Sequence, residues 1–425
     1  MVTNPDSLRW RWPVYSNLAV LGVIVLAYGA VSGRLERSPF SGALVFMSLG
    51  YILGPGVLGV LDLTMGAGGF RLVAELTLAL ILFVEAADAN VSVLKRSYRI
   101  PERMLAIGLP LSIALGFAVG VPIFPDLTLL EVALLATMLA PTDAALGKAV
   151  VTNPNVPPSV REGLKVESGL NDGICVPILF AFLAVAAGSA SREGSTLWLG
   201  LELFAREIGI GAAVGVVLSL GASKTLGPLS RRPGWIGETW LPMMVPALAL
   251  SCFATAQALH GSGLIAAFVG GITVAFLRPP KKHQWLQAAE SIGDTLSLLT
   301  WVAFGAMVVS QALPKLGWDH VLYAALSLTV IRMLPLFLSL TGLPLGTVDK
   351  LFVGWFGPRG LVSVVFVIIV LDRGLPGGDS MAMAVVCTVL LSIVAHGLSA
   401  VPLARIYGAR VGTGSTMDPE GQDKG

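Results

Sequence analysis

Long apolar segments recur along almost the whole chain, and they constrain its fold more than any other feature. A helix that crosses the hydrocarbon core of a bilayer needs about 20 mostly apolar residues, and thirteen segments meet this requirement. They lie at residues 14–33, 40–60, 72–89, 104–123, 129–150, 163–186, 198–223, 241–259, 261–278, 294–313, 319–341, 350–371 and 380–405. The connections between them are short. The sequence therefore predicts an all-α polytopic membrane protein.

The composition excludes several other classes of protein. Hydrophobic residues make up 55% of the 425 residues and charged residues only 13%, whereas about a quarter of the residues in soluble domains are charged. The net charge is +2, and no basic patch suggests nucleic acid as a partner. The three cysteines lie in apolar segments and the four histidines lack the spacing of metal ligands, so we expect no disulfide and no cofactor.

The distribution of lysine and arginine predicts the orientation in the membrane. With the N-terminus placed outside, most basic residues in the predicted loops fall on the inside, as the positive-inside rule requires. We therefore expect a multi-pass protein of the cell (inner) membrane with a cytoplasmic C-terminus. Its predicted parts are an N-terminal tail at 1–13, a transmembrane domain at 14–405, and a short disordered tail at 406–425.

Two predicted helices are interrupted at corresponding places in the two halves of the chain. The fifth contains Pro141-Thr142-Asp143, and the twelfth contains Gly357-Pro358-Arg359-Gly360. An offset of seven helices reverses direction, so residues 14–186 and 241–405 are predicted to be inverted repeats. Paired interruptions are typical of transporter binding sites, because unwound backbone at membrane depth is tolerated only around an enclosed cavity. Ordinary proline kinks are the alternative, but each break also carries an ionisable residue.

Four ionisable residues stand out at membrane depth, where a charge predicts a functional role. They are Asp143, Glu167, Asp172 and Arg359. On a helix, Glu167 and Asn171 share one face, and Ser168 and Asp172 share the adjoining face. Asn171 can then bond to Glu167, while Ser168 and Asp172 present oxygen atoms that suit a hard cation such as Na⁺.

A polar helix start at the membrane surface is the alternative explanation for these residues. It accounts in part for Glu167, which would lie near the positive end of the helix dipole. It does not account for Asp172, because the sequence that follows Gly173 is continuously apolar.

Three motifs of this chain resemble those of monovalent cation:proton antiporters of the NhaP/NHE type. They are Thr142-Asp143, Glu167-Ser168-Gly169-Leu170-Asn171-Asp172-Gly173, and Gly357-Pro358-Arg359-Gly360. The resemblance covers about residues 14–405. It implies thirteen helices in two inverted repeats, crossed broken helices at positions five and twelve, and a homodimer.

The resemblance also implies roles for individual residues. Asp172 would bind Na⁺ and H⁺ alternately, and the other ion ligands would be Glu167, Ser168 and the main chain of Thr142. Asp143 would lie at the helix crossing, and Arg359 would form an ion pair with Glu167.

Three further polar residues in predicted spans are less specific. Leu82-Phe83-Val84-Glu85-Ala86-Ala87 resembles a family Leu-Phe-x-x-Gly-Leu stretch, with Ala86 at the glycine position. Glu85 is then either a second acid near the cavity or an acid paired with a base near the helix end. Arg332 is interpreted as structural, and His396 as a core histidine with satisfied hydrogen bonds.

The predicted activity is exchange of Na⁺ (or Li⁺) for H⁺, with these ions as substrates and no enzymatic chemistry. Desolvation favours the protonated form of a buried carboxyl group, so the two ions can compete at Asp172. An unoccupied carboxylate would be costly to carry across the membrane, which couples the two fluxes. Electrogenic relatives have Asp at the position of Asn171, so the resemblance implies one-for-one exchange.

Two other activities remain open at this point. A K⁺/H⁺ antiporter would share the fold, because the choice of ion depends on small differences in cavity size. A cation channel could use the carboxylates as a selectivity ring, although the two breaks carry opposite charges and a ring needs like charges. Hydrolase and protease motifs are not found in the sequence.

Overall fold

The computed structural model describes residues 11–35, 41–61, 63, 67–88, 99–143, 146–151, 153, 155–189, 196–277 and 282–414. Within these ranges the regular structure is entirely helical. In chain order the elements are α2 (Arg11–Leu35), α3 (Gly42–Leu53), α4 (Ala67–Asp88), α6 (Arg99–Arg103), η1 (Met104–Gly108), α7 (Leu109–Ile123), α8 (Leu129–Met138), α9 (Lys148–Val151), α10 (Pro158–Ser189), α11 (Thr196–Ser230), η2 (Leu241–Met243), α12 (Met244–Ala258), α13 (Gly263–Leu277), α14 (Lys282–Ala303), η3 (Phe304–Val309), α15 (Ser310–Ala312), η4 (Leu313–Lys315), α16 (Trp318–Leu328), α17 (Val330–Ser339), α18 (Thr347–Trp355), α19 (Leu361–Leu371) and α20 (Gly378–Gly414).

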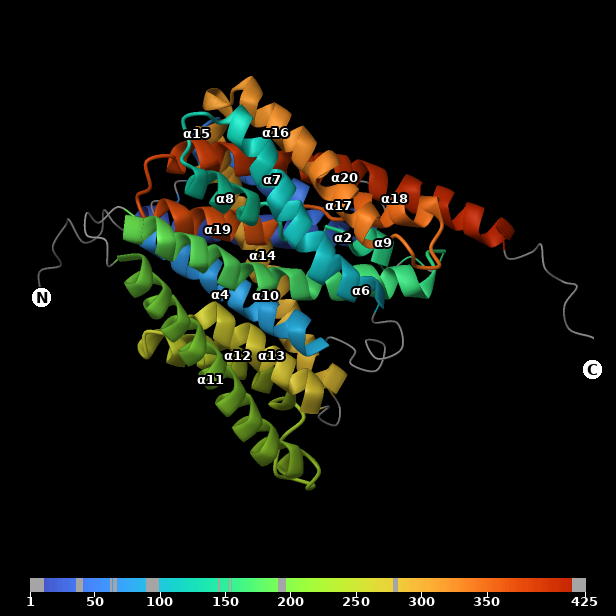
Figure 1. Ribbon diagram of the computed structural model, residues 1–425. Helices are drawn as coiled ribbons and strands as arrows, with labels where there is room; N and C mark the ends of the chain where they lie inside the picture. Colours follow the sequence, from blue (N-terminus) through green and yellow to red (C-terminus); the bar gives the residue numbers. More distant parts are fainter. Residues whose placement is uncertain are drawn as a thin grey trace, which may run out of the picture.

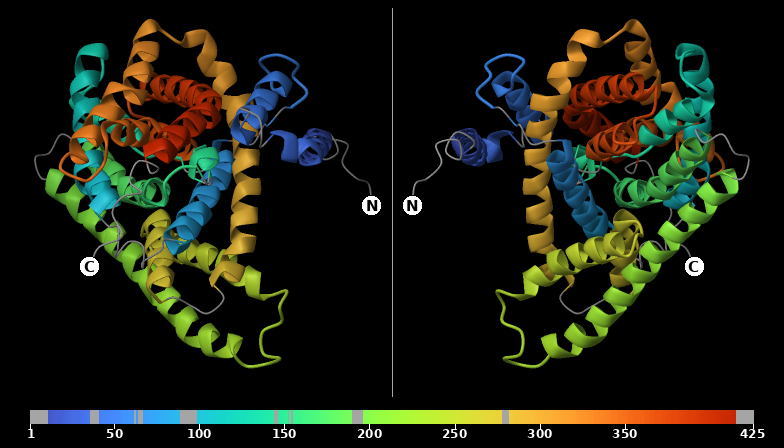
Figure 2. Two further views of the ribbon diagram at one scale, coloured as in Figure 1. Left: turned by 90° about the vertical axis from the view of Figure 1, so that its right-hand side faces the viewer. Right: turned by 90° about the vertical axis from the view of Figure 1, so that its left-hand side faces the viewer.

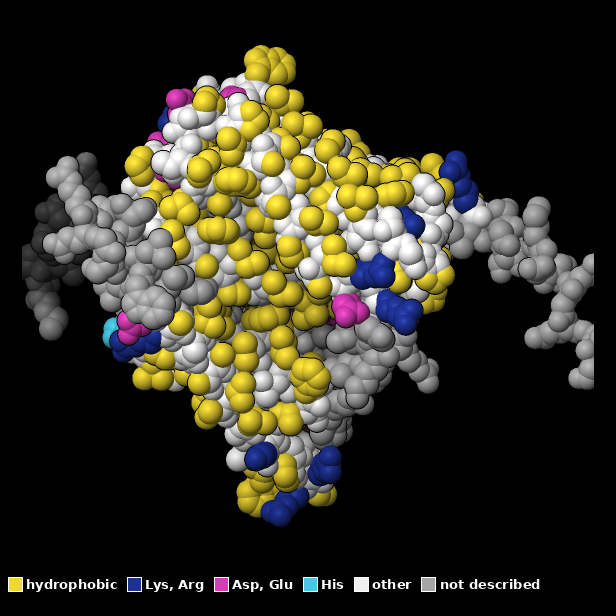
Figure 3. All heavy atoms as spheres, viewed as in Figure 1, with side chains coloured by type: hydrophobic (Ala, Val, Ile, Leu, Met, Phe, Trp, Pro, Cys, Tyr) yellow, Lys and Arg dark blue, Asp and Glu magenta, His cyan; other side chains and the backbone are white. Residues whose placement is uncertain are grey.

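The predicted fold class is confirmed, since each of the thirteen predicted spans contains helix. Among the described residues, eight helices are long and apolar enough to cross a membrane, and α3, α8, α13 and α19 are shorter apolar helices. Figure 3 shows hydrophobic side chains spread over the middle of one face, with the charged side chains gathered toward its edges. This distribution fits a molecule whose middle is surrounded by lipid.

The helices form two bundles. The first bundle consists of α3, α4 and α11–α14, with α4 packed chiefly against α13 and α14. The second bundle consists of α6–α10 and α16–α20, and it occupies the upper part of Figure 1. Helix α2 lies at one side of the molecule (Figure 2) and contacts α3 through the rings of Tyr28 and Phe46.

Three predicted boundaries are wrong. The second span ends at Leu53, ahead of Gly54-Pro55-Gly56, because proline disfavours helix at the preceding residue. Helix α14 begins at Lys282 rather than near 294. Its first turns carry polar residues, so a search for apolar segments did not include them. Residues 406–414 continue α20 rather than forming a disordered tail, and the hydroxyl of Tyr407 donates to Asp349 Oδ1 at 2.6 Å. The predicted tails at 1–10 and 415–425 lie outside the described residues.

Candidate functional site

The two predicted helix breaks are in contact within the second bundle. One break separates α8 from α9, and the other separates α18 from α19. The backbone N–H of Asp143 in the first break donates to the carbonyl oxygen of Pro358 in the second, at 2.8 Å. The predicted crossing of the fifth and twelfth helices is therefore confirmed.

Charged side chains from each break stabilise the helix ends of the other. Asp143 Oδ2 accepts a 3.1 Å hydrogen bond from the N–H of Leu361, the first residue of α19. Arg359 Nη1 donates to the carbonyl oxygens of Ala140 at 2.7 Å and Pro141 at 3.0 Å, just beyond α8. An anion at a helix N-terminus and a cation at a C-terminus both complement the helix dipole. The two opposite charges of the crossing thus serve as helix caps.

Helix α20 provides partners for further polar groups of the second break. Ser392 Oγ accepts the N–H of Arg359 at 2.7 Å, and His396 Nε2 lies 2.9 Å from the carbonyl oxygen of Trp355. His396 Nδ1 lies 3.2 Å from Ser392 Oγ. His396 Nδ1 also lies 2.9 Å from the carbonyl oxygen of Ser392, so each ring nitrogen has a polar neighbour. The prediction of a satisfied core histidine is confirmed.

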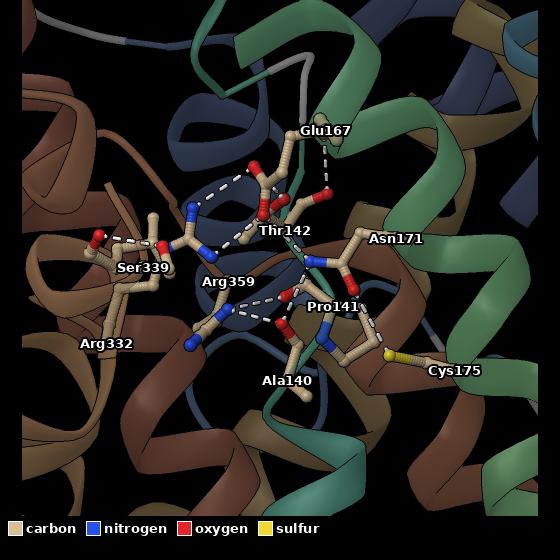
Figure 4. Close-up of polar contacts among 11 residues, drawn as sticks. Ala140, Pro141, Thr142, Glu167, Asn171, Cys175, Arg332, Ser339 and Arg359 are labelled. Atoms are coloured by element: carbon tan, nitrogen blue, oxygen red, sulfur yellow. Dashed lines mark hydrogen bonds and ion pairs between the residues drawn. The ribbon is translucent and has the colours of Figure 1, made fainter. Parts of the chain in front are cut away.

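Glu167 forms a two-pronged ion pair with Arg332. Arg332 Nη1 lies 2.8 Å from Glu167 Oε1, and Nη2 lies 3.1 Å from Oε2, with both side chains buried. The predicted ion pair between Arg359 and Glu167 is therefore wrong. The reason is that the guanidinium group of Arg359 is turned to the carbonyl groups at the end of α8, as Figure 4 shows.

Two neutral side chains complete the surroundings of Glu167 (Figure 4). Asn171 Nδ2 donates to Glu167 Oε1 at 3.1 Å, as predicted, and to the carbonyl oxygen of Ala140 at 3.3 Å. Thr142 Oγ1 donates to Glu167 Oε2 at 3.4 Å. Cys175 Sγ lies 3.2 Å from Asn171 Oδ1, which fixes the orientation of the amide. Glu167 is thus held from α10, α17 and the first break.

The predicted ion ligands come together beside this network. Ser168 Oγ donates to the carbonyl oxygen of Thr142 at 2.8 Å, so two neutral oxygens are adjacent. Asp172 lies one helical turn beyond Ser168 and is 2% exposed. Its Oδ1 accepts no hydrogen bond from the described residues. A buried carboxylate oxygen without a donor is unfavourable unless a proton or a cation compensates its charge.

Asp172 lines an acidic cavity of about 400 Å³ between the two bundles. Helices α4 and α14 form one wall, and α10 with the two breaks forms the other. The carboxyl groups that line it are those of Glu85, Asp88, Asp143, Glu162, Asp172, Glu290 and Asp294, and Lys165 is the basic residue in the described lining. Such a cavity concentrates cations near Asp172.

Glu85 lines the cavity. Of its two predicted roles, the structure favours a second acid near the cavity over an acid paired with a base at the helix end. Its Oε2 is buried without a hydrogen-bond partner, and it forms no ion pair with the described basic residues. The ion pair at this end of α4 instead joins Asp88 Oδ2 to Lys165 Nζ at 2.5 Å.

A second cavity of about 210 Å³ lies at the opposite end of α4, again between the bundles. It is lined by Arg71, Glu75 and Glu207 of the first bundle and by Ile369 and Arg373 of the second. Arg71 also forms an ion pair with Asp372, which joins α4 to the end of α19 on this side.

Sequence reasoning missed the partner of Glu167 and part of the cavity wall. Arg332 lies within a predicted span. A charged side chain at that depth is as unfavourable for Arg332 as for Arg359, and it indicated a buried partner just as strongly. Glu290 was missed because it lies ahead of the predicted span at 294–313, and Asp294 was missed although it is the first residue of that span. No described group of three or more His, Cys, Asp and Glu side chains has the arrangement of a metal site.

Comparisons with known proteins agree with this arrangement. The family described as "Sodium/hydrogen exchanger, transmembrane" matches residues 19–406. The K(+)/H(+) antiporter NhaP of Alkalimonas amylolytica is 26% identical over 401 residues, which are 92% of this chain and 67% of that protein. The K(+)/H(+) antiporter NhaP2 of Shewanella oneidensis is 24% identical over 87% of this chain and 64% of its own length. The chain thus spans about two thirds of the length of these relatives.

A solved structure shares the fold. The sodium proton antiporter MjNhaP1 from Methanocaldococcus jannaschii superposes with a TM-score of 0.75 at 19% identity, over 90% of this chain and 99% of that one. The crossed helix breaks, the buried acidic site and the family match over most of the sequence lead to one assignment. The chain belongs to the transmembrane sodium/hydrogen exchanger family.

Proposed function

We propose that this protein is a secondary active antiporter that exchanges Na⁺ for H⁺ by competition at Asp172. The observation that carries the proposal is the position of Asp172. A buried carboxylate with an unpartnered oxygen lies on the wall of a cavity lined by further acids. Because either a proton or a cation can neutralise this oxygen, the two ions exclude each other.

The cation ligands in this proposal are Asp172, Ser168 Oγ and the carbonyl oxygen of Thr142. Ser168 Oγ donates its hydrogen to the carbonyl oxygen of Thr142. Both oxygens still have lone pairs that can bind a cation. Both carboxylate oxygens of Glu167 already accept from Arg332, so Glu167 holds the site in place rather than contacting the ion. Asp143 and Glu85 attract the cation from the cavity wall.

The two cavities support alternating access. They lie at opposite ends of α4, and between them Gly173, the neighbour of Asp172, packs on Phe268 of α13. A Cβ atom at Gly173 would lie 2.2 Å from the ring of Phe268, so this contact leaves no room for a side chain. We propose that the second bundle moves past this contact and exposes Asp172 to each cavity in turn.

The buried charges of the second bundle support one-for-one exchange. Glu167 is neutralised by Arg332, and Asp143 and Arg359 are opposite charges at one crossing. Asp172 with one Na⁺ or one H⁺ is then neutral, so the loaded site would add no net charge to the moving bundle. The exchange rate in liposomes should not respond to an imposed valinomycin/K⁺ potential, provided that K⁺ is not a substrate. Acceleration by voltage of either sign would show that net charge moves.

Orientation and assembly are also proposed. The larger cavity opens near Asp88, Glu162 and Glu290, at the ends of α4, α10 and α14 that the positive-inside rule places in the cytoplasm. The N-terminus would then be outside and the C-terminus inside. We also propose a homodimer, with α2 at the edge of the protomer exposing Leu18, Leu26 and other large apolar side chains. Exchange of this kind would contribute to pH homeostasis.

The test is exchange in proteoliposomes followed with a pH-sensitive dye while Na⁺, Li⁺ and K⁺ are varied. Dissipation of the pH gradient by Na⁺ and Li⁺, but not by K⁺, is the expected result. K⁺/H⁺ exchange is the second candidate, because the two bacterial relatives described above are named K(+)/H(+) antiporters. Single-channel currents in a planar bilayer would instead identify a channel and refute antiport.

A further inference from the structure

The end of α11 and the loop after it form an exposed basic and aromatic surface, which we call the tip (residues 224–240). Lys224, Arg231 and Arg232 are exposed there. Trp235 and Trp240 are 65% and 67% exposed. Figure 3 shows dark blue side chains gathered at the lower extremity of the molecule, where α11 ends in Figure 1. Such large indole surfaces are unusual for a water-exposed loop.

Helix α11 packs closely on α13 near its middle and carries the tip to the edge of the molecule. Cβ atoms at Gly211 and Gly215 would lie 2.6 Å from the carbonyl oxygen of Ser262 and 2.5 Å from that of Ala266, so the backbones of α11 and α13 touch. Beyond this contact α11 diverges from its neighbours, as both Figure 1 and Figure 2 show. The tip therefore projects from the first bundle.

The tip lies at the end of the molecule where the larger cavity opens. The ion pair between Asp88 and Lys165 places the end of α4 beside the start of α10. Helix α11 follows α10 and runs in the opposite direction (Figure 1), so its last turn returns to that end. Exposed apolar residues such as Val217 and Phe276 on nearby turns face the surroundings of the bundle. The tip thus lies where an apolar surface gives way to a polar one.

The side chains of the tip match the chemistry of an anionic lipid headgroup. Tryptophan prefers the boundary between hydrocarbon and headgroups because its ring is apolar and its N–H is polar. Arginine donates several hydrogen bonds to phosphate in a fixed geometry, and the guanidinium carbon of Arg232 lies 5.9 Å from the ring centroid of Trp235. Glu238 is the one acid of the tip, so positive charge predominates.

We infer that the tip binds the phosphate groups of anionic phospholipids and so anchors the first bundle in the membrane. The arginines would contact phosphate while Trp235 and Trp240 lie among the headgroups. The anchoring itself follows from the tip and its chemistry. A second role, in which the anchored tip holds the first bundle still while the second bundle moves, rests on the function proposed above.

The experiment measures tryptophan quenching in vesicles of phosphatidylcholine that contain brominated phosphatidylglycerol or brominated phosphatidylcholine. The contribution of the tip is the difference between the wild type and the variant Trp235→Phe/Trp240→Phe. We expect stronger quenching of these two residues by the anionic lipid. In Arg231→Gln/Arg232→Gln this preference should fall about tenfold, because each basic residue near an anionic surface contributes to attraction.

The matched control is Arg405→Gln/Arg410→Gln, which removes two basic residues from the exposed end of α20. It should leave the lipid preference of the tip unchanged. Equal quenching by the two brominated lipids, or an unchanged preference in the tip variant, would overturn the inference. A shift from dimer to monomer without a change in quenching would show that the tip contacts a second copy instead. Because quenching requires no transport, these outcomes are independent of the antiport assay.

Discussion

At the scale of single residues, the buried charges of the second bundle differ in how the protein compensates them. Glu167 is paired with Arg332, and Asp143 and Arg359 are bonded to the helix ends at the crossing. Asp172 has a carboxylate oxygen without a described donor. A buried charge without a partner is unfavourable. Its neutralisation therefore depends on what enters from the cavity.

Replacement of Asp172 by asparagine removes the charge but retains nearly the same volume. We expect Asp172→Asn to abolish exchange while its melting temperature in detergent stays at or above that of the wild type, because an uncompensated charge is lost. The measurement combines proteoliposome exchange with thermal unfolding. The control is Asp126→Asn, an exposed acid that does not line the cavity. Wild-type rates in Asp172→Asn would refute the assignment of the site.

The pair of Glu167 and Arg332 is predicted to act on stability. Removal of one partner of a buried pair typically costs about 3–5 kcal/mol because the other charge stays buried. Glu167→Gln and Arg332→Gln should each lower the melting temperature and the yield. The double variant should lose less than the sum of the two, since no unpaired charge remains. Additive losses would show that the two side chains are not energetically coupled.

Some contacts of single residues can be predicted from the sequence and others cannot. Asp172, Ser168 and the bond from Asn171 to Glu167 follow from helical periodicity, because they lie on neighbouring turns of one helix. The partner of Glu167 does not follow, since Arg332 and Arg359 are both arginines within spans. The choice between them depends on α17 and on the crossing, which are packed together only in three dimensions.

At the scale of elements, the crossing of the two broken helices leaves no space for an additional atom at Gly360. A Cβ atom there would lie 1.9 Å from Asp143 Oδ2, the atom that caps α19. Glycine is therefore required by the close approach of the capping carboxylate. This contact explains the glycine at position 360.

Gly360→Ala should displace Asp143 from the end of α19. Overpacking of this kind costs about 1–3 kcal/mol, so we expect a lower melting temperature together with a large loss of exchange. Gly221→Ala in α11 is the control, because a Cβ atom there has no neighbour within 4 Å and alanine favours helix. Equal behaviour of the two variants would mean that the crossing tolerates displacement of the cap.

Hydropathy located thirteen segments that each contain helix, because length and apolar content decide whether a segment can cross a membrane. It failed at α14, whose early turns bury Trp285 and Leu286 but place Glu290 and Asp294 on the cavity. It also failed beyond residue 405, where α20 continues because Tyr407 stacks on Phe352 of α18 at 4.0 Å. Both errors come from tertiary contacts that a sequence window does not contain.

At the scale of the whole molecule, the two bundles and the two cavities define what can move. The larger cavity reaches Asp172, and the smaller one lies beyond the contact of Gly173 with Phe268. The sequence predicts the paired breaks but not this placement, because the relative position of two bundles depends on packing between distant segments. In the proposed mechanism, the same carboxylate would face one cavity at a time.

Competition at one carboxylate makes a prediction about the dependence of affinity on pH. In the proposed mechanism Na⁺ binds the deprotonated form of Asp172, so the fraction available to Na⁺ should decline as the pH falls. Well below the pH at which the site is half protonated, the apparent KM for Na⁺ should rise about tenfold per pH unit, because proton binding and cation binding are linked. Above that pH the KM should become constant.

The maximal velocity should respond at the other end of the pH range. At high pH the return step slows, because few sites take up the proton that it requires, so activity at equal pH on both sides should follow a bell-shaped curve. The measurement is the apparent Na⁺ affinity in proteoliposomes at several symmetric pH values. A KM that stays constant while only the velocity changes would mean that protons act at a group other than Asp172. In that case the bell shape would require a separate pH-sensing residue, and the single-site mechanism would be wrong.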